Sequence, residues 1–203
     1  MGMCLALATV RDENISRMLA DPPLVWRVIA PDDPEMYEEA RKSDSAEPSL
    51  LGRLFGAKAR AASPTTDLVL ADGEVVATDL DKAWHGIHYL LTGVDGDGAP
   101  PLNLLVAGGQ YVGTVDVGYG PARVLRPREV QEAHRALELL SDEELRRRFL
   151  PADMMKKGIY PEIWDRDPEQ DDTLGYLMEY VGTLRSFLAQ ASRDGRGIVV
   201  YLS

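Results

Sequence analysis

IVVYLS, residues 198–203, is an apolar run rich in β-branched residues, and it predicts a buried strand near the centre of a sheet. The residues before it, 174–191, repeat leucine and valine at helical spacing and predict the longest helix of the chain. A second apolar run, residues 3–10, predicts another buried strand. Strands that are separated by helical segments are typical of layered α/β domains.

The expected architecture is therefore an α/β fold, a three-layer sandwich with a central mixed sheet and helices on both faces. Because the first and the last strand of the chain are both expected inside the sheet, we expect one domain over 1–203. The composition shifts towards Ser, Ala, Pro and Lys over about 43–66, which predicts a variable surface loop. An Asp-Gly pair predicts a hairpin over 68–78, and an apolar run predicts a strand over 101–109.

The composition indicates a globular protein with an acidic surface. Hydrophobic residues make up 45% and charged residues 27% of the chain, and its formal net charge is −11. An acidic surface repels phosphate backbones, so we expect no nucleic-acid partner, whereas a basic protein partner would be complementary in charge. Cys4 is the only cysteine, which excludes an intramolecular disulfide. The apolar run around Cys4 is too short to span a membrane, so we expect a cytoplasmic protein without a membrane anchor.

LDKAWHGIHYLLTG, residues 80–93, predicts a helix that ends at a glycine and carries two histidines. On a helical wheel its apolar residues, with Trp84 among them, share one broad face. Asp81, His85 and His88 share the flank immediately beside that face. The spacing of three and four residues makes these polar side chains neighbours on the helix surface, and therefore candidates for a site.

Three interpretations of this flank stay open at the level of sequence. Asp81 could orient an imidazole as a general base, or Asp81, His85 and His88 could supply three metal ligands. Alternatively, Thr78 and Asp81 form a capping box, and the histidines are core-rim residues with one ring nitrogen hydrogen-bonded. Because D-x-x-x-H-x-x-H is not a motif with a known mechanism, we favour the structural interpretation and expect no metal.

Several segments together resemble a known family. LDKAWHGIHYLLTG, DVGYGPARVL (116–125) and the final YLS occur in the order found in the YfbM-like family of bacterial proteins of unknown function. MGMCLAL at the start and GIYPEIWD (158–165) are similar to the same pattern. The resemblance covers nearly the whole chain outside 43–66. It implies a single three-layer α/β domain in a bacterial cytosolic protein, and it implies no reaction.

DVGYGPAR, residues 116–123, is a second candidate segment. Gly118 and Gly120 flank Tyr119, and glycines let another group approach the main chain closely. Asp116 offers a carboxylate, Tyr119 a hydroxyl and Arg123 a bidentate anion fork, so a small acidic or phosphorylated ligand could bind here. The structural alternative is a tight turn that places Tyr119 over the sheet edge. Neither a P-loop nor a dinucleotide fingerprint is present in the sequence, so we expect no cofactor.

Two functional hypotheses follow. No catalytic motif is recognised, which favours a non-enzymatic acidic binding or interaction protein over an enzyme. The alternative is an enzyme or small-molecule binder whose site joins the flank at 81–88 to the turn at 116–123. That alternative requires the two segments to lie close together in space.

Overall fold

The computed structural model describes residues 2–44 and 67–203. The loop expected over about 43–66 lies almost wholly outside the described residues. Five strands form one sheet, and they are β1 (Leu5–Val10), β2 (Ala77–Asp79), β3 (Gln110–Asp116), β4 (Pro121–Leu125) and β5 (Gly197–Leu202). The helices before β2 are α1 (Asp12–Ala20), the 3-10 turn η1 (Pro22–Val25), α2 (Trp26–Ile29) and α3 (Pro34–Asp44). The later helices are η2 (Asp81–Ala83), α5 (Trp84–Thr92), α6 (Pro127–Glu138), α7 (Asp142–Arg148), α8 (Pro151–Lys156) and α9 (Thr173–Arg193).

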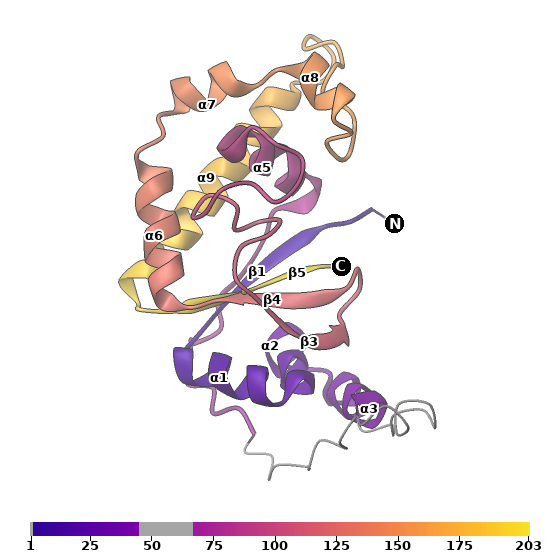
Figure 1. Ribbon diagram of the computed structural model, residues 1–203, viewed down its shortest axis with the longest axis vertical. Helices are drawn as coiled ribbons and strands as arrows, with labels where there is room; N and C mark the ends of the chain where they lie inside the picture. Colours follow the sequence, from indigo (N-terminus) through magenta and orange to yellow (C-terminus); the bar gives the residue numbers. More distant parts are fainter. Residues whose placement is uncertain (1, 45–66) are drawn as a thin grey trace, which may run out of the picture.

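The strand order is β2-β1-β5-β4-β3, and all four pairings among the described strands are antiparallel. The α/β fold is confirmed, but the sheet is antiparallel and not mixed. The reason lies in the connection from β4 to β5. Leu125 at the end of β4 pairs with Ile198 at the start of β5, so the chain leaves and re-enters the sheet at the same end. Figure 1 shows α6 leading away from that end, with α9 returning beside it.

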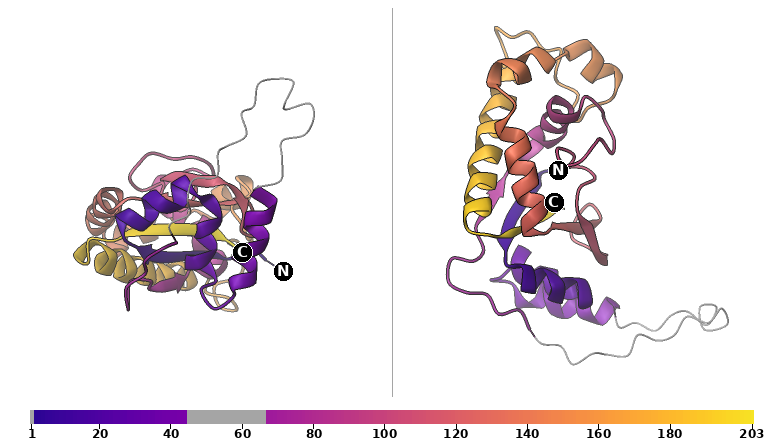
Figure 2. Two further views of the ribbon diagram at one scale, coloured as in Figure 1. Left: turned by 90° about the horizontal axis from the view of Figure 1, so that it is seen from below. Right: turned by 60° about the vertical axis from the view of Figure 1, so that its left-hand side comes forward.

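Helices cover both faces of the sheet, which gives the three layers. Successive residues of a strand point to opposite faces. In β1, Leu5 and Leu7 belong to one buried cluster, whereas Ala8 and Val10 belong to the other. Helices α5, α6 and α9 cover the larger cluster, and α1, η1 and α2 cover the smaller one, as Figures 1 and 2 show. A strand buried on both faces reads as a continuous apolar run, which is why the sequence of β1 does not alternate.

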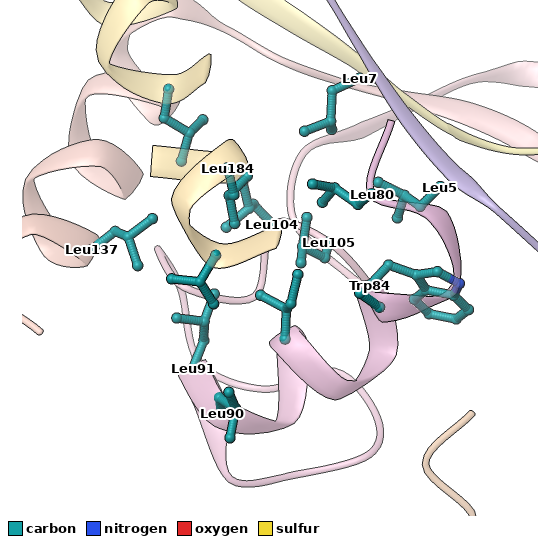
Figure 3. Packing of buried hydrophobic residues seen from close by; sticks show 14 of the residues in the cluster. Leu5, Leu7, Leu80, Trp84, Leu90, Leu91, Leu104, Leu105, Leu137 and Leu184 are labelled. Atoms are coloured by element: carbon teal, nitrogen blue, oxygen red, sulfur yellow. The ribbon is translucent and has the colours of Figure 1, made fainter. Parts of the chain in front are cut away.

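The larger cluster holds the helix that carries the histidines. Figure 3 shows leucines from the sheet, from the loop before β3 and from α5 converging on one another. Members labelled there include Leu5, Leu7, Leu80, Trp84, Leu90, Leu91, Leu104, Leu105, Leu137 and Leu184. The helix α9 expected over 174–191 is confirmed, and the Asp172 side chain caps it by accepting from the backbone N–H of Gly175. None of the described helices is both long and apolar enough to cross a membrane.

The hairpin predicted over 68–78 is wrong in its first arm. A turn does form at Gly73, but only residues after it join the sheet, as β2. The buried carboxylate of Glu74 explains the difference. It accepts from the backbone N–H and Nε of Arg11 and from Nδ2 of Asn14, which pins the segment against α1. Contacts with residues distant in the sequence therefore override the local hairpin signal.

The strand predicted over 101–109 is also wrong, because this segment forms consecutive turns. Leu104 and Leu105 are buried and Leu102 is partly buried, but the segment does not pair with a strand of the sheet. The carbonyls of Leu104, Leu105 and Gly108 instead accept hydrogen bonds from the side chain of Arg123 on β4. The single-domain expectation stays a prediction, although the sheet does join residues 5–10 to residues 197–202.

Candidate functional site

A cavity of about 200 Å³ opens beside the C-terminal end of β5. The turn between β3 and β4, the loop before β3 and the start of α5 complete its walls. Figure 1 shows the end of β5 next to the β3–β4 turn. The lining residues are Leu5, Trp84, Leu105, Val106, Tyr111, Tyr119, Pro121, Arg123, Val200, Tyr201 and Leu202. The cavity therefore brings together three of the candidate residues, Trp84, Tyr119 and Arg123.

Arg123 is the charged residue of this cavity, and its side chain is only 7% exposed. Its Nη1 donates to the carbonyls of Leu104 and Gly108, and its Nη2 donates to the carbonyl of Leu105 over 2.7 Å. Burial lowers the pKa of Arg123, but a guanidinium keeps its proton at neutral pH. No carboxylate of the described residues forms an ion pair with it. The cavity thus contains a buried positive charge without a counterion.

The guanidinium of Arg123 also has donors to spare. It carries five N–H groups, and three of them are used by the loop carbonyls. Nε has no acceptor among the described residues, yet it is not one of the enclosed unpaired atoms and so remains accessible. Because Arg123 lines the cavity, its unpaired Nε is the donor that a molecule there can reach.

Two tyrosines stand at the mouth of the cavity. Tyr111 is 59% exposed and Tyr119 is 49% exposed, so about half of each side chain is open to solvent. Tyr111 lies on β3 directly opposite Arg123 on β4. Tyr111 was not among the residues predicted from the sequence, because its place beside Arg123 depends on strand register. The pairing of GGQYVG with PARVL across a tight turn was the signal that could have indicated it.

The turn between β3 and β4 is held by Asp116. Its Oδ1 accepts from the backbone N–H groups of Gly118, over 2.9 Å, and of Gly120, over 3.0 Å. These two bonds lower the pKa of Asp116. The backbone N–H of Tyr119 donates to the carbonyl of Leu202 and ties the turn to β5. Asp116 therefore orders the turn and does not line the cavity, whereas Tyr119 does.

His85 and His88 hold loops against α5. Nε2 of His85 lies 2.8 Å from the carbonyl of Asp95, and Nε2 of His88 lies 2.6 Å from the carbonyl of Gly96. His88 is fully buried, and His85 also accepts from the backbone N–H of Tyr160. Burial is the main reason why the pKa of each histidine is lowered. Neither histidine lines the cavity, and the arrangement matches the core-rim interpretation.

Trp84 links this helix to the cavity. Its indole N–H donates to the carbonyl of Met3 over 3.1 Å. Its ring stacks on His85, with centroids 4.9 Å apart, and on Tyr160, with centroids 5.9 Å apart. Trp84 is therefore a fixed part of the wall.

Asp81 does not line the cavity beside Arg123. It also does not form the capping box predicted with Thr78. The helical segment begins at Asp81 itself, with Leu80 as the N-cap residue and no capping side chain. The carboxylate of Asp81 accepts from Sγ of Cys4, 3.4 Å away, and from the hydroxyl of Tyr176, 2.9 Å away. Asp81 and Tyr176 border a second cavity of about 240 Å³. Among residues 2–44 and 67–203, no group of three or more His, Cys, Asp or Glu side chains is arranged to hold a metal ion.

Comparison with known proteins identifies the family. The sequence profile of the domain of unknown function DUF1877 matches residues 1–201. The chain belongs to the DUF1877 family. The crystal structure of YfbM from Escherichia coli, a protein of unknown function, is similar in fold. It superposes with a TM-score of 0.61 at 19% identity, over 98% of this chain and 99% of that chain. No curated protein matches the chain.

The resemblance to the YfbM-like family is thus confirmed, and the DUF1877 assignment brings no reaction with it. The composite site expected between 81–88 and 116–123 forms only in part in this DUF1877 protein. Trp84, Tyr119 and Arg123 meet at one cavity, whereas the histidines bind loops. A functional role for any of these residues stays a prediction.

Proposed function

We propose that this protein binds a small organic anion in the cavity beside Arg123. The observation that carries the proposal is the buried guanidinium, which has unused donors and no carboxylate partner among the described residues. Burying a charge is costly unless it is paired. A neutral donor would hold the carbonyls of the loop before β3 at a lower desolvation cost. A positive charge at this position becomes favourable when a bound anion pairs with the guanidinium.

The remaining lining residues support binding more than catalysis. They are aliphatic or aromatic and include no carboxylate, imidazole or thiol, as far as the described part of the chain extends. A mostly apolar cavity with a small number of polar groups is typical of a small-molecule binding site. An acid–base mechanism would need a titrating partner within hydrogen-bond distance of the ligand. We therefore favour a small-molecule binding protein, which is part of the alternative hypothesis from the sequence and not the hypothesis that the sequence favoured.

The proposal is tested by following the Nε–H resonance of Arg123 by NMR while acetate, a small carboxylate probe, is added. We expect a saturable shift that an equal concentration of chloride does not produce, because only a carboxylate matches the geometry of the two free donors. Arg123→Gln assigns the resonance by removing it. Equal, non-saturating responses to acetate and chloride would contradict the proposal.

A basic protein partner is a second proposal, and it is supported by the net charge of −11. Opposite charges accelerate encounter and are screened by salt. A pull-down from bacterial lysate at low ionic strength should retrieve a basic protein whose retention falls steeply as salt is added. Retrieval of nothing reproducible at low salt argues against this partner. A bacterial, cytoplasmic location belongs to the same proposal.

A further inference from the structure

We infer that the anion bound at Arg123 is a monocarboxylic acid with a flat, apolar body, for which an aromatic carboxylate is the model ligand. This inference rests on the proposed function and specifies its ligand. It follows from the number of free donors, from the aliphatic wall and from the two tyrosines at the mouth.

The free donors of Arg123 match a carboxylate in number. Two N–H groups remain, one on Nε and one on Nη2, and these adjacent nitrogens form one edge of the guanidinium. Two parallel hydrogen bonds to the two oxygens of a carboxylate satisfy both partners. A phosphate group has further charged oxygens, and apart from the tyrosine hydroxyls no lining side chain other than Arg123 has a free donor for them. The donors thus favour a carboxylate over a phosphate.

The wall around Arg123 requires an apolar ligand body. More than half of the lining residues are aliphatic, and they are Leu5, Leu105, Val106, Pro121, Val200 and Leu202. A second charged group on the ligand would lose hydration here, and no second charged side chain lines the cavity to pair with it. The nearest carboxylate of the turn, on Asp116, is already bound to two backbone N–H groups and does not line the cavity. The ligand is therefore a monoanion.

The aromatic residues favour a flat body. The ring of Trp84 is already stacked on His85 and Tyr160. Tyr111 and Tyr119 remain half exposed at the mouth, and neither has a ring partner in the described part of the chain. Aromatic rings gain stability by offset or edge contact beyond the burial of their area. A ligand ring that enters carboxylate-first can contact one or both phenol rings.

The test is isothermal calorimetry of the full chain with four probes: benzoate, benzamide, acetate and phosphate. We expect benzoate to bind at least about tenfold more tightly than acetate or phosphate. Only benzoate has both a carboxylate that can pair with Arg123 and a ring that can contact the apolar wall. Benzamide has the same shape without the charge, and its affinity should be at least about tenfold weaker than that of benzoate. Tighter binding of phosphate than of benzoate would overturn the inference.

Variants separate this inference from the proposed function. Tyr119→Ala removes an exposed ring but keeps the backbone bond to Leu202, and it should weaken benzoate about three- to tenfold and acetate by a smaller factor. Leu139→Ala, at an exposed residue outside the cavity, is the matched control and should change neither affinity. Equal affinities for acetate and benzoate overturn the inference and leave the proposed function standing. Failure of all four probes to bind overturns both.

Discussion

Nδ1 of His85 accepts a hydrogen bond from the backbone N–H of Tyr160 over 3.0 Å. Because Nδ1 accepts, the proton of the neutral ring must sit on Nε2, which donates to the carbonyl of Asp95. One imidazole thereby ties two loops to α5. A second proton on Nδ1 would leave Tyr160 without its acceptor. The folded state thus requires the tautomer of His85 that carries its proton on Nε2.

Acid should therefore destabilise the protein through its histidines. The pKa values of His85 and His88 are lowered in the folded state, mainly by burial. The unfolded chain, with a histidine pKa of about 6.5, then binds more protons than the folded chain as the pH falls. Stability is fully present above this pKa and is lost as the pH falls towards the folded pKa values. Urea unfolding from pH 8 to pH 5 measures the loss.

The matched comparison for this pH series is the double variant His85→Gln and His88→Gln, because carboxylates elsewhere also titrate in acid. The variant should start from a lower stability and show a shallower decline with acidification than the original chain. Parallel curves for the two proteins would mean that these imidazoles do not couple protonation to folding.

Arg123→Met should destabilise the protein by about 2–4 kcal/mol, since it leaves the carbonyls of Leu104, Leu105 and Gly108 without a donor. The free energy of unfolding in urea provides the measurement. Arg128→Ala is the control, because its ion pair with Glu132 is exposed and should contribute less than about 1 kcal/mol. A similar small loss in both variants would show that the loop does not depend on Arg123.

Gly118→Ala should destabilise the turn that carries Tyr119. Gly118 has a φ of 139°, and an added Cβ would lie 2.8 Å from the carbonyl oxygen of Leu202. We expect a loss of about 1–3 kcal/mol. Gly96→Ala is the control, because a Cβ at Gly96 meets nothing within 4 Å. Thermal unfolding compares the two variants, and equal melting temperatures would contradict the strain at Gly118.

Cys4 should react slowly with alkylating reagents. Burial and the carboxylate of Asp81 raise the pKa of its thiol, and the thiolate is the reactive species. At pH 8 the native protein should react with iodoacetamide more slowly than the urea-unfolded chain. Asp81→Asn should accelerate the native reaction, whereas Tyr176→Phe, which keeps the charge of Asp81, should not. Equal rates in native and unfolded protein would refute the effect.

The sequence predicted correctly those elements whose own residues form a continuous apolar run or an apolar stripe at helical spacing. The runs at 3–10 and 198–203 became adjacent strands, and the stripe at 174–191 became α9. The hairpin at 68–78 and the strand at 101–109 failed for a common reason. Their backbone polar groups are bound by side chains distant in sequence, Arg11 in one case and Arg123 in the other.

The candidate site was predictable to the extent that single segments carry it. The turn at 116–123 indicated Tyr119 and Arg123, and both line the cavity. Tyr111 was not predictable, because its place depends on the pairing of β3 with β4. His85 and His88 looked like ligands because their helical spacing is the same whether they face a metal or a loop carbonyl. Only the loop at 95–96 distinguishes the two.

The central claim is that an organic carboxylate binds in the cavity and accepts hydrogen bonds from the unused donors of Arg123. A crystal structure of the protein grown with benzoate tests it most directly. We predict one benzoate in the cavity, with its two oxygens about 3 Å from Nε and Nη2 and its ring against Tyr111 or Tyr119. A cavity without benzoate at saturating concentration, with protein carbonyls occupying both donors, would contradict the claim.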